Sequence, residues 1–368
     1  MPHTSDRPSL FSFATGELSQ DAILAWLLAW ADESFAATDP ALHEAGCQFV
    51  ETLFEVARSL QPVPAIQPVE GRSLRALPER PYRITAETQR DRIDIIATVN
   101  DTHLIVIEDK VHAGETGDQL SRYPEQVRKR FSAYDVALLY LKTGEQASYK
   151  SAHENGWAVV ERGHLLGILQ NAVQDSDNAI LHDYFAHLSA IEETVQSFTS
   201  TNPKDWKDQH VLRYSGFFKA LAEALGQGDW GYVSNPRGGF PAFWWSHLQT
   251  NDSGSEIYLQ LEADVLVAKI HVPEKETQSV VRNRWITRIC DDLHGFAPPK
   301  HRRRGATMTL AVHRGSDEES DSNSYFVLDS AMGSVDVKQT AEHLRRIASE
   351  LAALIGRHGG AAVPLKTR

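Results

Sequence analysis

The sequence predicts an α/β fold for the first half of the chain and an α+β region for the second half. In the first half, runs of β-branched and aliphatic residues alternate with stretches of helical periodicity. Residues 136–141 (VALLYL) are almost wholly apolar, as expected of a strand that is buried on both faces of a sheet. At 368 residues the chain is too long for one ordinary domain, so we expect two.

The elements of the first domain follow one another in a compact order. Ser19 is the predicted N-cap of the first helix, and the turn-forming pair Asn100 and Asp101 separates two β-rich runs. The expected helices span 17–35, 43–60, 118–130, 163–173 and 178–196. The expected strands span 82–87, 93–99, 103–109, 136–141 and 157–160.

A stretch rich in turn-forming residues divides the chain. Residues 197–206 (SFTSTNPKDW) predict a linker between a domain over 1–196 and a C-terminal α+β domain over 207–368. In the second domain we expect strands at 231–234, 242–247, 256–261, 265–272, 308–313 and 325–328, and helices over 217–225, 277–293 and 337–355. Its role stays open between recognition, sensing and dimerisation.

Composition and charge narrow the classes of function. No apolar run approaches the roughly 20 residues that span a bilayer, and the N-terminus lacks the basic-then-apolar order of a secretory signal. Cys47 and Cys290 are the only cysteines, which excludes a disulfide framework and a cysteine-rich zinc site, so we expect a cytoplasmic protein. The net charge of −12 disfavours a broad basic surface, so any nucleic-acid contact must be local or supported by metal ions.

The stretch around residues 93–110 concentrates charge at the end of an apolar strand. Asp94 lies on the opposite face of its strand from Ile93 and Ile95, and residues 104–107 lead into Glu108, Asp109 and Lys110. Unpaired buried charges cost several kcal/mol, so this strand end needs compensation. A divalent cation between carboxylates would supply it.

The length of the turn decides whether these side chains meet. If residues 100–102 form a three-residue turn, Val99 pairs with His103 and Asp94 lies opposite Glu108. Lys110 then points to the same face as both carboxylates. A two-residue turn would place Asp94 opposite Ile107 instead, so the predicted cluster requires the longer turn or a bulge.

Residues of these types suit metal-assisted hydrolysis of phosphodiesters. Neighbouring carboxylates bind hard cations such as Mg²⁺ or Mn²⁺ through oxygen, and we expect Asp94, Glu108 and the backbone carbonyl of Asp109 as ligands. Lys110 could orient or help to deprotonate a water, or stabilise charge that develops on a phosphate. Metal and ammonium together favour phosphodiester hydrolysis.

An acidic residue on one strand followed by an acidic-x-Lys triplet on the next resembles the PD-(D/E)XK nuclease superfamily. Asp94, Glu108 and Lys110 match its motif, with Ile93 in place of the motif's proline. Gln119 and Tyr123 resemble the Gln-x-x-x-Tyr motif of several branches. The resemblance covers about the first 195 residues and implies a restriction-endonuclease-like core, a mixed sheet flanked by helices.

The resemblance also implies a function and further site residues. It implies a Mg²⁺- or Mn²⁺-dependent nuclease that cuts DNA, or RNA, in bacterial restriction or anti-phage defence, and a homodimer would suit double-strand cleavage. The alternative is a catalytically inactive nuclease-fold protein that binds or senses nucleic acid. Accessory site candidates are Glu17, Asp21, Glu87 and Tyr123, and Gln119 is a candidate catalytic residue. Candidate nucleic-acid contacts are Arg122, Arg128, Lys129, Arg302 and Arg303.

Overall fold

The computed structural model describes ten stretches of the chain, which divides into two compact units, Met1–Glu193 and Thr194–Arg368. The described stretches are residues 8–14, 16–60, 77–90, 92–111, 119–206, 210–235, 238–252, 254–300, 305–313 and 325–362. Over these stretches, no helix combines the length and apolar character that crossing a membrane requires.

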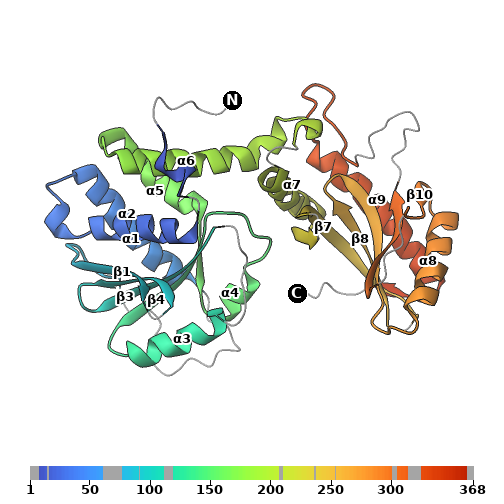
Figure 1. Ribbon diagram of the computed structural model, residues 1–368, viewed down its shortest axis with the longest axis horizontal. Helices are drawn as coiled ribbons and strands as arrows, with labels where there is room; N and C mark the ends of the chain where they lie inside the picture. Colours follow the sequence, from blue (N-terminus) through green and yellow to red (C-terminus); the bar gives the residue numbers. More distant parts are fainter. Residues whose placement is uncertain are drawn as a thin grey trace. The chain divides into compact units, whose positions relative to one another are not determined.

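The first unit is built on a mixed sheet with the strand order β1-β2-β3-β4-β5 (Figure 1). The antiparallel part comprises β1 (Ile84–Arg90), β2 (Ile93–Val99) and β3 (His103–Lys110). Two strands parallel to β3 follow, β4 (Asp135–Lys142) and β5 (Ala158–Glu161). The connecting helices are α3 (Gln119–Arg130), between β3 and β4, and α4 (Lys150–Glu154), between β4 and β5.

Helices cover both faces of this sheet (Figure 1). One face packs in a hydrophobic core against four helices, α1 (Glu17–Trp30), α2 (Pro40–Ser59), α5 (Arg162–Asp175) and α6 (Ala179–Gln196). The other face packs against α3 and α4 in a smaller core that includes Leu120, Tyr123 and Trp157. All eight residues of β3 are buried, so the charges at its end lie inside the protein.

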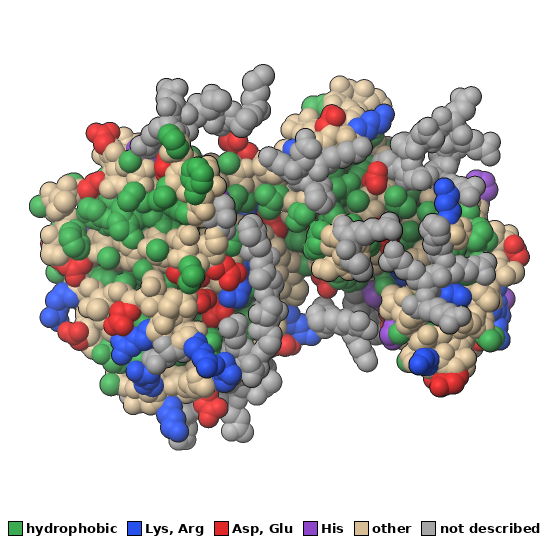
Figure 2. All heavy atoms as spheres, viewed as in Figure 1, with side chains coloured by type: hydrophobic (Ala, Val, Ile, Leu, Met, Phe, Trp, Pro, Cys, Tyr) green, Lys and Arg blue, Asp and Glu red, His purple; other side chains and the backbone are tan. Residues whose placement is uncertain are grey.

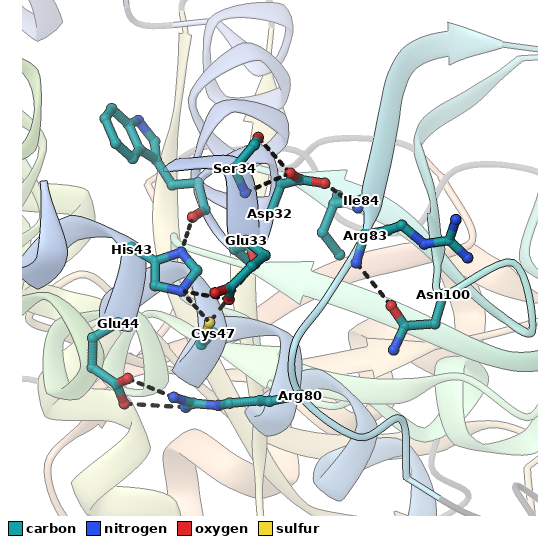
Figure 3. A network of polar contacts seen from close by, with 12 residues as sticks. Asp32, Glu33, Ser34, His43, Glu44, Cys47, Arg80, Arg83, Ile84 and Asn100 are labelled. Carbon is teal, nitrogen blue, oxygen red and sulfur yellow. Dashed lines mark hydrogen bonds and ion pairs between the residues drawn. The ribbon is translucent and has the colours of Figure 1, made fainter. Parts of the chain in front are cut away.

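The turn between β2 and β3 has the length that the predicted cluster requires. Val99 pairs with His103, which leaves a three-residue turn and confirms the longer of the two alternatives. Asn100 and Asp101 both have positive φ, 52° and 56°, which this short turn needs. The Asn100 side chain accepts a hydrogen bond of 2.8 Å from the backbone N–H of Arg83, which fastens the turn to the start of β1 (Figure 3).

The first helix differs from the prediction at both ends. Its N-cap is Gly16 rather than Ser19, and the helix ends at Trp30 instead of continuing to residue 35. Asp32 causes this end, because its carboxylate accepts hydrogen bonds from the N–H groups of Ser34 (3.0 Å) and Ile84 (2.8 Å) (Figure 3). Residues Glu33–Phe35 then form a separate 3-10 helix, η2.

The outer side of α1 is apolar. Leu18 is well exposed, and Trp26 and Trp30 are half-buried with their rings in edge-to-face contact. Figure 2 shows hydrophobic side chains gathered on the side of the first unit where α1 lies. Polar residues of α1 are confined to its first turns, which point toward the charged end of β3, as shown below.

The second unit is an antiparallel sheet packed against three helices. Its described residues form a seven-stranded sheet with the path β10-β11-β9-β8-β7-β12, and β6 pairs with β7. The strands are β6 (Asp229–Asn235), β7 (Gly238–Gln249), β8 (Glu256–Glu262), β9 (Val265–His271), β10 (Phe296–Ala297), β11 (Thr307–His313) and β12 (Ala361–Ala362). The helices are α7 (His210–Leu225), α8 (Gln278–Asp292) and α9 (Val337–Arg357), and they share one core with the sheet.

Several parts of this unit differ from or add to the prediction, among them the unpredicted short strands β10 and β12 and the start of α7 at His210 instead of residue 217. The strand expected at residues 325–328 is wrong, because only Leu328 pairs there, in an isolated bridge to Val335. Residues 197–206 contain two 3-10 helices, η3 (Ser197–Thr199) and η4 (Pro203–Asp205). Phe198 and Trp206 from this segment are buried in the core of the second unit.

Candidate active site

Three charged side chains meet where β2 begins and β3 ends. The Nζ atom of Lys110 lies 2.7 Å from Oε1 of Glu108 and 3.6 Å from Oδ2 of Asp94. The register explains this meeting, because Ile95 pairs with Ile107 on antiparallel strands. Asp94, one residue before Ile95, therefore lies beside Glu108, one residue after Ile107. The structure thus brings together the three residues that the sequence pattern singled out.

The backbone of Asp109 forms hydrogen bonds with this cluster, whereas its carboxylate lies on the opposite face of the strand. Its N–H donates to Oδ2 of Asp94 (2.9 Å), and its carbonyl accepts from Nζ of Lys110 (2.8 Å). Its buried Oδ1 accepts a hydrogen bond of 2.6 Å from Nε2 of Gln20 on α1. Gln20 in turn accepts from Oγ1 of Thr143 (2.8 Å), so the end of β3 is tied to α1 and to the segment after β4.

Both acidic residues predicted on the first helix reach the cluster. Oε2 of Glu17 lies 3.9 Å from Nζ of Lys110, and its Oε1 accepts from the N–H of Val111 (3.4 Å). Asp21 is only 1% exposed, and its Oδ2 accepts a hydrogen bond of 2.8 Å from Nε2 of Gln89. The first turns of α1 therefore add two carboxylates to those of β2 and β3.

Gln89 is a site residue that the sequence pattern did not reveal. Its Nε2 also lies 3.3 Å from Oδ1 of Asp94, so one amide joins the carboxylates of Asp21 and Asp94. Gln89 has a φ of 53°, a conformation that costs energy for a side chain of this kind. The predicted candidate on this strand was Glu87, whose half-exposed side chain forms an ion pair with Arg90 at 2.8 Å. Glu87 was the predicted residue because a carboxylate can bind metal, whereas the uncharged amide of Gln89 makes the contact with Asp21 and Asp94.

The cluster holds more negative charge than its few cations balance. Burial, and then the charge of Asp94, raise the pKa of Glu108, although Lys110 opposes the shift. Burial and Asp94 likewise raise the pKa of Asp21, to about 6. Burial alone would lower the pKa of Lys110, but Glu108 and the neighbouring carboxylates outweigh it and raise that pKa. Added positive charge would therefore stabilise this end of the sheet.

The oxygen atoms of the cluster fit a divalent cation. Glu108 Oε2 and Asp21 Oδ1 are buried and accept no hydrogen bond from any part of the chain that the structure describes. Such atoms are costly unless they receive a donor or a cation, and hard divalent cations prefer oxygen ligands. The described side chains include no group of three or more His, Cys, Asp or Glu residues placed to hold a metal ion, and Lys110 contacts both central carboxylates. Asp94 and Glu108 are the residues that would hold such an ion.

The structure describes some, but not all, of the other site residues that the sequence predicted on α3 and at 302–303. Gln119 begins the helix, but its side chain lies outside the described residues. Tyr123 is buried, and its hydroxyl donates to the carbonyl of Arg92 (3.0 Å), so it anchors the turn between β1 and β2. The guanidinium of Arg122 lies 5.4 Å from the centre of the Tyr123 ring. Arg128 and Lys129 are exposed in the last turn, and Arg302 and Arg303 lie outside the described residues.

The first unit is thus a mixed sheet between helices, in which the carboxylates of Asp94 and Glu108 meet the ammonium of Lys110 where β2 begins and β3 ends. The family model of the PD-(D/E)XK nuclease superfamily matches residues 13–213, which is more than half of the 368 residues, and the chain belongs to this superfamily. Members of the superfamily generally use divalent metal ions. Neither the curated proteins nor the solved structures gave a match.

Proposed function

We propose that the protein is a metal-dependent nuclease that hydrolyses phosphodiester bonds in DNA at the cluster of Asp94, Glu108 and Lys110. The observation that supports this most is the position of the Lys110 ammonium, 2.7 Å from one buried carboxylate and 3.6 Å from the other. Two carboxylates suit a divalent cation, and an adjacent ammonium suits the phosphate that the cation would bind.

Each side chain has a task that its surroundings support. A bound Mg²⁺ or Mn²⁺ would lower the pKa of an attacking water and withdraw charge from the phosphate. Asp94 and Glu108 would bind the ion, with the carbonyl of Asp109 as a further ligand. Because its pKa is raised, Lys110 keeps its proton at neutral pH, so we assign it to stabilising negative charge on the phosphate rather than to removing a proton from water.

The remaining candidates extend this proposal. Glu17 and Asp21 would act as accessory acidic groups beside the ion, and Gln119 would contact the water or the phosphate. Arg122, Arg128 and Lys129 on α3 would contact the DNA backbone. A role in restriction or anti-phage defence in the cytoplasm, recognition by the second unit, and a homodimer that cuts both strands all belong to the proposal and stay predictions.

A cleavage assay tests the proposal. The purified protein is incubated with linear, circular, branched and single-stranded DNA, and with RNA, in Mg²⁺, Mn²⁺ or EDTA. We expect cutting of DNA with metal, none with EDTA, and a loss of at least about a hundredfold for Lys110→Ala. Lys150→Ala is the matched control, because Lys150 is half-exposed on α4 and pairs with Glu154.

The outcomes separate the proposal from its alternative. If no nucleic acid is cut and calorimetry detects no Mn²⁺ binding that depends on Asp94, the site is inactive and the protein binds or senses without catalysis. Cutting of RNA alone would retain the chemistry and overturn the choice of DNA. Equal loss of cutting in Lys110→Ala and Lys150→Ala would remove the assignment of Lys110.

A further inference from the structure

Over the described residues, the end of β3 pairs with a neighbouring strand on one edge only. The register with β2 ends at Ile107, whereas the register with β4 continues to Lys110. Successive residues of a strand direct their backbone groups to opposite edges. The carbonyl of Lys110 accepts from the N–H of Thr143 on the β4 side (3.3 Å), so the backbone groups of Asp109 lie at the other edge.

Both backbone groups of Asp109 contact the active site at this edge. The N–H donates to Oδ2 of Asp94 (2.9 Å), and the carbonyl accepts from Nζ of Lys110 (2.8 Å). The same carbonyl is a ligand of the divalent cation in the proposed function. A displacement of Asp109 would therefore disturb a carboxylate, the ammonium and a carbonyl ligand together.

The side chain of Asp109 is held from the opposite face of the strand. Nε2 of Gln20 on α1 donates to Oδ1 of Asp109 at 2.6 Å. Oδ2 accepts no hydrogen bond from the part of the chain that the structure describes. Asp109 is 0% exposed and Gln20 is 6% exposed, so the contact is shielded from water. Among the described residues, the hold on this carboxylate thus depends on Gln20.

The amide of Gln20 is itself oriented by a fixed neighbour. Oγ1 of the buried Thr143 donates to Oε1 of Gln20 (2.8 Å), which leaves Nε2 to face Asp109. The backbone of Thr143 is bound on both sides, since its N–H donates to Lys110 and its carbonyl accepts from the guanidinium of Arg162 (2.5 Å). The hydrogen bond from Gln20 to Asp109 therefore has one defined direction.

Folding alone gives little reason for a polar pair at this position. Gln20 precedes Ile23 and Leu24 by three and four residues, so it shares the buried face of α1 with these two core residues. Two buried hydrogen-bonded groups can often be replaced by apolar groups of the same shape with little change in stability. A hydrogen bond, unlike an apolar contact, fixes both distance and direction. The pair is therefore better explained by a need to place Asp109 accurately.

We propose that Gln20 is a positioning residue of the active site, which holds the carboxylate of Asp109 and so fixes the Asp109 carbonyl as a ligand for the divalent cation. This inference rests on the proposed function. Gln20 would act through Asp109 and would not bind the ion itself.

The affinity for Mn²⁺ in the absence of DNA tests this role. The full-length protein is titrated with Mn²⁺ by isothermal calorimetry. For Gln20→Met, which removes the amide and keeps the approximate size, we expect the affinity to fall about tenfold or more. Asp109→Asn keeps an oxygen that can accept from Gln20, so it should retain the affinity. Gln48→Met is the matched control, because half-buried Gln48 on α2 donates to Glu44 (3.0 Å) away from this contact.

A double variant separates positioning from folding. Gln20→Met combined with Asp109→Leu replaces both partners by apolar groups, so we expect its melting temperature to lie near that of the wild type. Its affinity for Mn²⁺ should stay as low as that of Gln20→Met, because no directional contact then holds residue 109. Thermal melts by circular dichroism and the same titration give the two readouts.

The outcomes distinguish this inference from the proposed function. If the wild-type protein binds no Mn²⁺ and cuts no nucleic acid, the proposed function fails and the inference fails with it. If the wild type binds Mn²⁺ and a folded Gln20→Met variant binds it equally tightly, the inference alone is overturned. It is also overturned if the double variant recovers the wild-type affinity, or if neither variant folds, because the pair then serves only folding.

Discussion

Gln89 joins two carboxylates that come from different elements. Asp21 belongs to α1 and Asp94 to β2, and the amide nitrogen of Gln89 on β1 lies 2.8 Å and 3.3 Å from their oxygens. Groups that orient metal ligands matter nearly as much as the ligands themselves. Gln89 thus positions Asp94 without being a ligand itself.

Replacing Gln89 should weaken metal binding. We expect Gln89→Ala to reduce the affinity for Mn²⁺ by about tenfold or more, because Asp94 loses the group that orients it. Isothermal calorimetry measures this affinity directly. Thr88→Ala, a change at the exposed neighbouring position, serves as the control. Equal affinities for Gln89→Ala and the wild type would contradict the positioning role.

The ionisation of Asp21 should make stability depend on pH. Its pKa is about 6 in the fold against an ordinary 3.8, so the folded protein binds this proton more tightly than the unfolded chain does. The stabilisation from this proton is therefore complete below about pH 4 and is lost as the pH rises through 6. The raised pKa of Asp21 corresponds to at most about 3 kcal/mol in the free energy of unfolding.

Asp21→Asn removes this dependence. In EDTA, we expect the variant to unfold at a higher temperature than the wild type above pH 6, and at the same temperature near pH 4. Thermal melts followed by circular dichroism across this range give the comparison. A difference in melting temperature that stays constant from pH 4 to pH 8 would show that burial of the Asp21 charge is not its cause.

The turn between β2 and β3 is the element that assembles the site. Because side chains alternate along a strand, a change of one residue in the turn moves the partners of β2 to the other face. Deletion of Asp101 should therefore abolish Mn²⁺ binding and cutting, since Asp94 no longer meets Glu108. Asp101→Gly keeps the length and suits the positive φ, so it should retain both. Normal activity in a folded deletion variant would show that the register does not decide the site.

Local patterns predicted the site because its three central residues lie on one hairpin. The alternation of side chains along residues 93–99 and the length of the turn were sufficient to predict that Asp94 lies beside Glu108, as the observed register shows. Gln20 and Gln89 could not be found this way, since their places depend on the packing of α1 against the end of β3 and on the strained end of β1. Such long-range contacts leave no periodic signal in the sequence.

The wrong strand at residues 325–328 has a physical explanation. Tyr325 and Phe326 are buried by packing in the core of the second unit, which gives the same composition as a strand. Backbone N–H groups of this segment bond outside any strand ladder: that of Tyr325 donates to the carbonyl of Asp264 (3.0 Å), and that of Val327 donates to Oγ1 of Thr340 (3.1 Å). β-branched and aromatic residues indicate a buried segment, but a strand also needs a neighbouring strand with which its backbone can pair.

At the scale of the whole molecule, each unit has its own hydrophobic core. The first unit holds the two cores that enclose its sheet, and the second holds a single core built on residues from Phe198 to Ile355. Separate cores allow separate unfolding transitions. The proposed metal ligands all belong to the first unit.

Metal binding should therefore raise the temperature of only one of the two unfolding transitions. In scanning calorimetry we expect two transitions, of which Mn²⁺ at a hundred times its Kd raises only one, by about 5–10 °C. Asp94→Ala should abolish this shift and leave the other transition unchanged. A single transition, or an equal shift of both, would show that the units do not unfold independently.

The position of β3 at the centre of its sheet has a consequence for biosynthesis. The carboxylates of Asp94 and Glu108 are made before β4, and β3 gains its neighbour on the far side only when β4, which ends at Lys142, has been made. At about 5–20 residues per second, the stretch from the end of β3 at Lys110 to the end of β4 at Lys142 takes about 2–6 seconds to translate. A nascent chain that ends before Lys142 should neither bind Mn²⁺ nor cut, which ribosome-stalled chains of increasing length can test. Because β4 is added late, the incomplete nascent chain would not cut the nucleic acids around it.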